Sequence, residues 1–210
     1  MRGNLTLAYR FRMPSPAPPP DLTGLSLAEI ARLADAKKLP PVESWNPSHC
    51  GDSMMRIARD GTWYHEGSPI GRPAMVRLFA TILRREPDGT YVLVTPVEKL
   101  DIAVDDVPFV AVEMKSEGEG GDRMLAFRLN TGDVILAGPD HPIRFESRPD
   151  GPHPLIRVRG ALDALIARSV YYELAELALA EGACAEGACP EGERAPGLWS
   201  GGAWFAMAPE

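Results

Sequence analysis

Arginine side chains are concentrated in one stretch of this sequence, residues 54–86. The stretch contains six arginines and three acidic residues, although the whole chain has a formal net charge of −7. The planar guanidinium group of arginine suits two-point contact with a phosphate or a carboxylate. We therefore expect the cationic side of any anion-binding site to come from this stretch. Its arginines are Arg56, Arg59, Arg72, Arg77, Arg84 and Arg85.

A predicted β-hairpin would place part of this charge beside an aromatic ring. Asp60-Gly61 is typical of a two-residue turn between antiparallel strands, and in that register Arg56 lies opposite His65. Arg56, Trp63 and His65 then share one face of the hairpin. Arginine and imidazole groups could bind a phosphate there while the indole stacks on a base. The alternative is a half-exposed face on which Trp63 packs against a helix.

Arg72 is the fourth candidate ligand-binding residue. It stands directly before Pro73, and proline is favoured in the first turn of a helix. Backbone N–H groups point outward at a helix N-terminus, where they attract anions. Arg72 could therefore direct a phosphate group toward the start of the helix that is predicted after Pro73.

Known motifs of catalysis and metal binding are absent from the sequence. It contains no phosphate-binding loop, dinucleotide-binding glycine pattern, serine nucleophile elbow or zinc-protease motif. Its histidines are isolated, and His49-Cys50 is the only adjacent pair of soft metal ligands. Asp101, Asp105 and Asp106 are expected in a solvated turn. We therefore predict no catalytic residue, no metal site and no cofactor.

The composition limits the classes of partner. The chain has 210 residues, of which 45% are apolar and 24% charged, as in an ordinary globular protein. Its acidic balance argues against general binding to nucleic acid polymers or to anionic membranes. No apolar run approaches the roughly 20 residues that span a bilayer, and the first residues lack the pattern of a signal peptide. Three cysteines are too few for a disulfide scaffold. A cytoplasmic protein is the simplest interpretation.

The first part of the chain is predicted to be a tail followed by a small domain. Residues 1–21 end in a proline-rich run and are expected to be disordered. Residues 22–88 are expected to form a helix–hairpin–helix domain, and Ser26 and Glu29 form a capping box at the start of its first helix. A boundary is expected at the turn residues near position 88.

The second part is predicted to be a β-barrel. Seven apolar runs between residues 91 and 159 alternate with glycine, proline and aspartate, as strands and turns do. An amphipathic helix is expected over 161–180. Seven antiparallel strands closed by a C-terminal helix have the element order of a pleckstrin-homology-like barrel, so we predict an α+β fold with that domain at 89–180.

Residues 181–210 are predicted to be a second disordered tail. They contain a tandem AEGAC repeat and are rich in Gly, Ala, Glu and Pro, a composition that buries little apolar surface. In the alternative interpretation, Trp199, Trp204 and Phe205 dock on the folded body.

Two segments of similar pattern indicate an internal duplication. RDGTWYHEG at 59–67 aligns with NTGDVILAG at 130–138, with a turn glycine and a terminal glycine at the same spacing. Two unrelated hairpins can share this pattern by chance, so the hypothesis requires agreement between the two folds.

Three long stretches of the chain resemble a known bacterial family. They are LPPVESWNPSHCGDSMMRIARDGTWYHEGSPIGRPAMVRLFATIL, YVLVTPVEKLDIAVDDVPFVAVEM and VRGALDALIARSVYYELAEL. In order and without large gaps, they are similar to the domain-of-unknown-function family numbered 1285, over residues 25–180. The resemblance implies a two-domain core with an internal duplication, and a C-terminal part only superficially like the pleckstrin-homology fold.

The resemblance also has implications for function. It implies a binding site at the domain interface for a nucleotide-like ligand and a role in signal transduction, with no established enzymatic activity. The candidates at its motif positions are Trp63, Arg72 and, as secondary candidates, Glu98 and Lys99. We therefore expect a non-catalytic ligand-binding module that senses an anionic small molecule. A protein–protein interaction adaptor is the first alternative, and an enzyme without a recognisable motif is the second.

Overall fold

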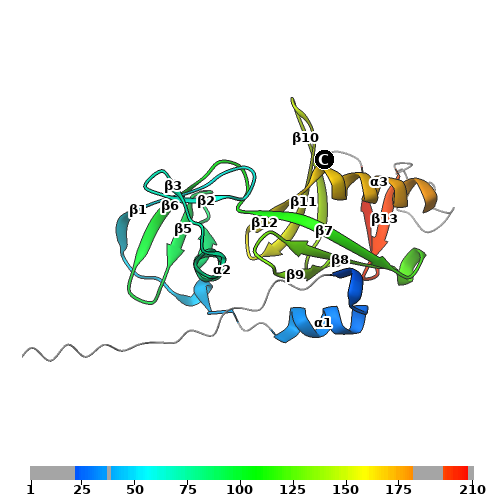
Figure 1. The fold of residues 1–210 in the computed structure, drawn as a ribbon, viewed down its shortest axis with the longest axis horizontal. Coiled ribbons are helices and arrows are strands. Elements are labelled where there is room, and N and C mark those ends of the chain that lie inside the picture. Colours follow the sequence, from blue (N-terminus) through cyan, green and yellow to red (C-terminus); the bar gives the residue numbers. More distant parts are fainter. Residues whose placement is uncertain (1–21, 37–38, 182–195, 208–210) are drawn as a thin grey trace, which may run out of the picture.

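Two six-stranded β-sheets lie side by side and form most of the protein (Figure 1). This computed structural model describes residues 22–36, 39–181 and 196–207. The first sheet is built from residues 49–104 and the second from residues 109–166. Helices are few, so the fold is mostly β with a small helical part.

The first sheet has the strand order β3-β2-β1-β6-β5-β4. The two central strands, β1 and β6, are parallel, and every other pair is antiparallel. Helix α2 (Pro73–Thr81) follows Pro73 as predicted and packs on the face that carries Trp63, whose ring stacks on Phe79. The strands are β1 (His49–Ile57), β2 (Trp63–His65), β3 (Ser68–Pro69), β4 (Leu83–Arg85), β5 (Tyr91–Val94) and β6 (Lys99–Val104).

The second sheet has the strand order β10-β11-β12-β7-β8-β9. Its central strands, β12 and β7, are again parallel. Helix α3 (Arg168–Glu181) follows the sheet and packs against β7. The strands are β7 (Phe109–Glu117), β8 (Met124–Leu129), β9 (Val134–Leu136), β10 (Ile143–Arg148), β11 (Gly151–Arg159) and β12 (Leu162–Ile166).

The two sheets share one topology. In each, the first and sixth strands form the parallel central pair, and each of these continues outward through two antiparallel neighbours. Such a repeat is consistent with the expected internal duplication. The aligned segments 59–67 and 130–138, however, are not equivalent: the first spans the turn between strands one and two of its sheet, and the second spans the turn between strands two and three.

The predicted seven-strand barrel is not formed. The seven predicted strands exist, but β5 and β6 belong to the first sheet and only the other five to the second. The expected boundary near residue 88 therefore falls inside the first sheet. The reason is strand pairing, because β6 pairs in parallel with β1 of the first sheet and β5 pairs with β6. The chain crosses between the sheets at residues 105–108.

The predicted C-terminal helix begins later than expected. Residues Leu162–Ile166 form β12 instead, paired with β11 on one side and β7 on the other. Leu162, Ala164 and Ile166 are buried there. A central strand flanked on both sides reads as a nearly continuous apolar run, which sequence periodicity does not separate from a helix.

The first helix does not join the hairpin of the first sheet. Its capping box is confirmed, because the backbone N–H of Ser26 donates to Glu29 Oε2 at 2.8 Å. Yet α1 (Leu27–Ala36) packs against β8 and β9 of the second sheet, where Ile30 is fully buried. The expected helix–hairpin–helix domain is therefore not formed. The proline-rich segment 1–21 lies outside the described residues.

A C-terminal hairpin corrects part of the predicted tail. Strands β13 (Gly197–Ser200) and β14 (Ala203–Ala206) pair with each other, and Leu198 and Phe205 are buried. Ser200 fixes the hairpin to the second sheet, because its Oγ accepts from the N–H of Leu125 at 2.9 Å and donates to the carbonyl of Ala137 at 2.8 Å. The alternative of docking aromatic residues is thus correct for this segment. Residues 182–195 and 208–210 lie outside the described part.

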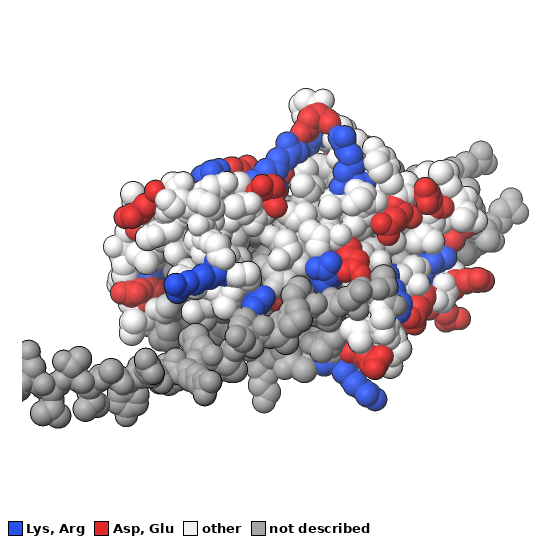
Figure 2. Space-filling model, viewed as in Figure 1, with Lys and Arg blue, Asp and Glu red and all other residues white. Residues whose placement is uncertain are grey.

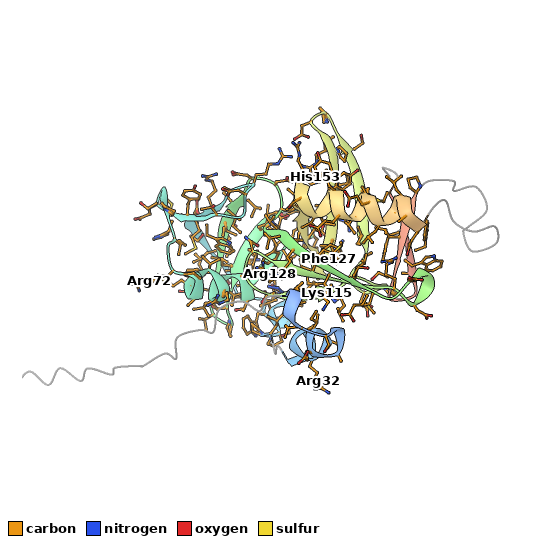
Figure 3. The ribbon with its side chains drawn as sticks, turned by 45° about the vertical axis from the view of Figure 1, so that its right-hand side comes forward. Arg32, Arg72, Lys115, Phe127, Arg128 and His153 are labelled. Atoms are coloured by element: carbon orange, nitrogen blue, oxygen red, sulfur yellow. The ribbon has the colours of Figure 1, made fainter. Side chains whose placement is uncertain are left out.

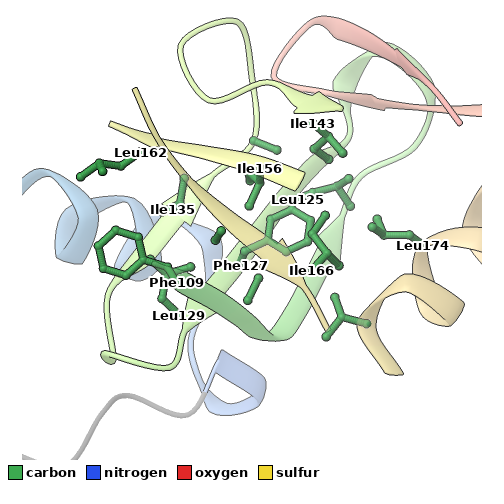
Figure 4. Packing of buried hydrophobic residues seen from close by; sticks show 14 of the residues in the cluster. Phe109, Leu125, Phe127, Leu129, Ile135, Ile143, Ile156, Leu162, Ile166 and Leu174 are labelled. Carbon is green, nitrogen blue, oxygen red and sulfur yellow. The ribbon is translucent and has the colours of Figure 1, made fainter. Parts of the chain in front are cut away.

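One apolar cluster runs through both sheets and holds them together. It extends from Ile57 and Trp63 in the first sheet to Leu174 in α3 and Phe205 in the C-terminal hairpin, and Figure 4 shows its centre around Phe127. Single-turn 3-10 segments lie at Leu22–Gly24, Val42–Ser44 and Gly120–Asp122. Among the described helices, none has the length and apolar character needed to cross a bilayer.

Candidate functional site

The hairpin that carries the predicted site has a different register from the expected one. Arg56 lies opposite Tyr64, and Ile57 lies opposite Trp63. The turn therefore contains three residues, Arg59–Gly61, and Gly61 has a left-handed φ of 81°, as is common in three-residue hairpin turns. A shift of one residue moves side chains to the opposite face of a sheet, so the expected arrangement of Arg56, Trp63 and His65 is wrong.

Trp63 lies inside the protein and is unavailable for stacking on a base. Its side chain is 1% exposed, and its ring stacks on Phe79 with centroids 6.4 Å apart. This is the alternative in which Trp63 packs against a helix. Arg56 lies on the other face, where its guanidinium group lies over the ring of Tyr64 and pairs with Asp105 at 2.5 Å.

The other sequence candidates do not gather at one place. His65 is exposed at the edge of β2, and Arg72 is exposed directly before α2. In Figure 3, Arg72 lies at the outer edge of the molecule, far from His153. Glu98 is exposed in the turn before β6, and Lys99 lies 3.6 Å from Glu86.

The arginine-rich stretch forms no single basic patch either. Arg84 is buried and donates to the carbonyls of Val42 and Trp45, so it holds the segment before β1 in place. Arg85 lies over the ring of Tyr91. Basic and acidic side chains alternate over the face seen in Figure 2. The residue types alone predict one site, but most of these arginines have separate structural partners.

A pocket between the sheets brings together a different set of residues. It has a volume of about 290 Å³, close to the lower limit for small-molecule sites. Arg59 enters from the turn of the first sheet, and the remaining residues come from β11, β12, α3 and the turn before β11. We call it the α3 pocket. It is lined by Arg59, Asp150, Pro152, His153, Pro154, Leu165, Ile166, Arg168, Tyr171 and Tyr172.

Asp106 organises the base of the α3 pocket from the connection between the sheets. Its carboxylate accepts from His153 Nε2 at 2.9 Å and from Arg148 Nη1 at 2.8 Å. Arg59 Nε lies 3.4 Å from the same carboxylate. These three side chains come from both sides of the junction, so one nearly buried carboxylate fixes the first sheet against the β10–β11 hairpin.

Electrostatics keep these carboxylates ionised. Burial alone would raise the pKa of Asp106, but the hydrogen bonds from His153 and Arg148 outweigh it and hold the pKa below its usual value. Arg59 donates to Asp150, which lies 2.8 Å away, and this bond lowers the pKa of Asp150 and raises that of Arg59. The ion pairs therefore persist across the neutral pH range.

His153 presents a nitrogen without a hydrogen-bond partner. Its Nε2 donates to Asp106, because a carboxylate accepts only. Its Nδ1 makes no hydrogen bond with any described residue, and the nearest carboxylate oxygen, on Glu146, is 3.5 Å away. The side chain is buried at the pocket wall, so Nδ1 is a buried polar atom without a hydrogen bond.

The start of α3 supplies the outer wall of the pocket. Tyr171 and Tyr172 lie with ring centroids 6.1 Å apart, and Tyr172 is 57% exposed. Arg168, the first residue of α3, is exposed and has no ion-pair partner in the described residues. A helix N-terminus also favours negative charge. The pocket thus combines aromatic surface with cationic groups.

Sequence reasoning missed most of this site. The sequence predicts Asp106 in a solvated turn and His153 as an isolated residue, because 47 residues separate the two in the chain. One signal was available: Asp105-Asp106 followed by Val107-Pro108 is an acidic pair entering an apolar strand. Two adjacent carboxylates at a boundary between domains can bind basic side chains from both domains.

Comparison with known proteins agrees with this two-part architecture. The N-terminal domain of unknown function DUF1285 matches residues 40–107, and the C-terminal domain of the same family matches residues 108–207. The two matches meet where the chain passes from one sheet to the other. No curated protein sequence matches the chain.

Two solved structures are similar to the chain. A DUF1285 family protein from Silicibacter pomeroyi DSS-3 is 45% identical, with 88% of this chain and 95% of that chain covered and a TM-score of 0.72. A DUF1285 family protein from Shewanella baltica OS155 is 23% identical, with 60% and 92% covered and a TM-score of 0.48. On the extent of the two domain matches and the first of these structures, the chain belongs to the DUF1285 family.

Proposed function

We propose that this protein is a non-catalytic binding module that senses a nucleotide-like anionic small molecule in the α3 pocket, with a role in signal transduction. One observation carries the proposal: Arg59 of the first sheet and Arg168, Tyr171 and Tyr172 of α3 line a single pocket between the two halves of the chain. The proposed ligand class is the one that the sequence analysis predicts. The site itself is different from the one expected.

The chemistry of the pocket favours a ring that carries a negative group. Tyr172 offers an exposed aromatic face, and stacking of a base on such a ring is worth about 1–3 kcal/mol. Arg168 is free to pair with a phosphate, whereas Arg59 is already engaged by Asp150 and Asp106. The anionic group therefore belongs near Arg168 and the start of α3, and the ring belongs beside Tyr172.

The position of the pocket suits a sensor. Its walls come from both sheets, and a ligand that contacts both stabilises one arrangement of them over any other. A ligand that binds only the folded protein raises the stability by about 2.7 kcal/mol at a concentration of 100 times Kd. For a chain of this size, that corresponds to a rise in Tm of roughly 5–11 °C.

A thermal-shift titration with adenosine 5′-monophosphate tests the proposal on the full chain. We expect a saturable rise in Tm that is lost in Arg168→Ala and reduced in Tyr172→Ala. Arg72→Ala is the matched control, because Arg72 is also exposed and without an ion-pair partner in the described residues but lies outside the pocket. An equal rise in Arg168→Ala and the wild type, or no rise at all, would refute the proposal.

Two alternatives from the sequence stay predictions. A protein-interaction adaptor would use exposed apolar residues such as Leu179 on α3, which is 75% exposed. An enzyme would use the Asp106–His153 pair, in which a carboxylate orients an imidazole as it does in many general bases.

A further inference from the structure

His153 (Figure 3) lies between two carboxylates that come from different parts of the chain. Its Nε2 is 2.9 Å from Asp106 Oδ2, in the connection between the sheets, and its Nδ1 is 3.5 Å from Glu146 Oε2 on β10. Glu146 is the residue directly opposite His153 in the β10–β11 pair. One buried ring thus joins the connection to the edge strand of the second sheet.

A neutral imidazole satisfies only one of these two contacts. It has a single N–H, which Nε2 uses to donate to Asp106. Nδ1 then carries a lone pair that faces the oxygen of Glu146, and two acceptors repel each other. This is the buried Nδ1 that has no hydrogen bond among the described residues, and such atoms are rare in folded proteins. A second proton would make Nδ1 a donor and turn the repulsion into a charge-assisted attraction.

The charges around the ring favour that second proton. Arg148 is shared by Asp106 and Glu146, at 2.8 and 3.5 Å, and Arg59 is engaged by Asp150 at 2.8 Å. Three carboxylates therefore face two guanidinium groups, and a protonated His153 balances the remaining negative charge. No ion pair within the described part of the chain joins Arg168 to this cluster. The ionisable groups around the ring and the pocket that it lines are Asp106 in the connection, Arg59 in the turn before β2, Glu146 and Arg148 on β10, Asp150 in the turn before β11, and Arg168 and Tyr171 on α3.

We propose that His153 is a pH-sensitive link of the sheet junction, which takes up a second proton on Nδ1 and then donates to Asp106 and Glu146 at once. The proton comes from solvent by way of the Glu146 carboxylate, which is 41% exposed. The unfolded chain cannot form this double contact, so protonation stabilises the folded protein. The junction is strongest at mildly acidic pH, where the carboxylates stay ionised, and weakens as the pH rises toward about 8 and Nδ1 loses its proton. This inference goes beyond the proposed function, because it needs no ligand.

Long-range ¹H–¹⁵N correlation spectra of the full chain, labelled at its histidines, report the protonation of each ring nitrogen. The sequence has four histidines, and His153→Gln identifies the signals of His153 by their loss; sequential assignment of the wild type serves if that variant does not fold. At about pH 6 we expect both nitrogens of His153 to be protonated, with slow exchange of the Nδ1 proton because the ring is buried. At about pH 8 only Nε2 should carry a proton.

Glu146→Gln measures what the second contact contributes. The amide keeps the shape of the side chain but removes the charge that faces Nδ1, and its N–H can donate to an unprotonated Nδ1. The advantage of the wild type in the folding equilibrium constant, measured by urea unfolding, should therefore be about three to ten times larger at about pH 6 than at about pH 8. Partial exposure of Glu146 keeps the factor at this size. His49, His65 and His141 are the same in both proteins, so their titration cancels in the comparison.

Glu117→Gln is the matched control. Glu117 is 40% exposed, against 41% for Glu146, and it pairs with a lysine, Lys115, rather than with a histidine. Lysine does not titrate between about pH 6 and 8, so the effect of this substitution on stability should be the same at both pH values. The proposal is overturned if Nδ1 of His153 is unprotonated at about pH 6, or if the effect of Glu146→Gln is as independent of pH as that of Glu117→Gln.

Discussion

Removal of the Asp106 carboxylate should weaken the junction between the two sheets. The Asp106 side chain is only 5% exposed, and it accepts from His153 and Arg148 while Arg59 lies close by. In Asp106→Ala, His153 remains buried with no carboxylate on Nε2. Arg148 and Arg59 lose a partner as well, but both are partly exposed and can be solvated instead.

The expected loss follows from this difference in burial. Leaving a buried donor without its acceptor costs about 1–3 kcal/mol, and more where one partner is charged. Because His153 is left fully buried and its acceptor was a carboxylate, we expect the upper end, about 3 kcal/mol. In a chain of this size each kcal/mol lowers Tm by roughly 2–4 °C, so Tm should fall by about 6–12 °C.

Thermal and urea unfolding at pH 7 measure the effect, with Asp105→Ala as the matched control. Asp105 is the neighbouring carboxylate and also pairs with an arginine, Arg56, but both side chains are at least 40% exposed. Exposed pairs contribute about 0–1 kcal/mol, so the control should lose little. Equal stability of the two variants would refute the reasoning that burial makes Asp106 the anchor.

The pH dependence of the free energy of unfolding provides a second test of the role of Asp106. The pKa of Asp106 is lower in the folded protein than in the unfolded chain, where an aspartate titrates near pH 3.9. Its ionised form therefore stabilises the fold above the unfolded pKa, and this contribution is lost as the pH falls through the folded pKa. The difference between wild type and Asp106→Ala should shrink below about pH 4. A difference that grows in acid would contradict the assignment.

Two further substitutions test particular contacts. In Gly61→Ala the new Cβ would lie 2.3 Å from Asn130 Nδ2, so unfolding should show a greater loss of stability than in Gly67→Ala. Gly67 has a similar φ, 77° against 81°, with no atom within 4 Å of the new Cβ; equal losses would mean that the turn can move away from Asn130. Ser200→Ala removes two buried hydrogen bonds of the C-terminal hairpin and should lose about 1–3 kcal/mol, while Ser169→Ala, exposed on α3, should lose almost none. A stable Ser200→Ala would show that its apolar residues alone hold the hairpin.

The local elements of this fold could be predicted from the sequence, but their partition into sheets could not. Pro73 and the Ser26–Glu29 capping box act within one turn of chain, and both helix starts are where these residues indicate. The central parallel pair of the first sheet, by contrast, joins β1 to β6 across about 40 intervening residues. Apolar alternation indicates that a strand has a buried face, but it does not identify the neighbouring strand.

The predicted grouping of Arg56, Trp63 and His65 on one face is wrong because the hairpin has a different register. The predicted two-residue turn and the observed three-residue turn differ by one residue, which is enough to move Trp63 into the core and leave Arg56 on the opposite face. Asp60-Gly61 fits both turns, because glycine takes the left-handed position in each. The observed sites depend on contacts between distant segments, such as Asp106 with His153, and no pattern within a single segment encodes these.

The hairpin turn Arg59–Gly61 joins the α3 pocket to the second sheet. Arg59 lines the α3 pocket and pairs with Asp150, and the carbonyl of Gly61 accepts from Asn130 Nδ2 at 3.1 Å. Asn130 also accepts from the N–H of Val110, so the turn is fixed to the first residues of β7. A ligand in the α3 pocket therefore meets a wall whose position is set by a contact between the sheets. Loss of the Asn130 side chain should weaken nucleotide binding in the thermal-shift titration, whereas Arg72→Ala should leave it unchanged.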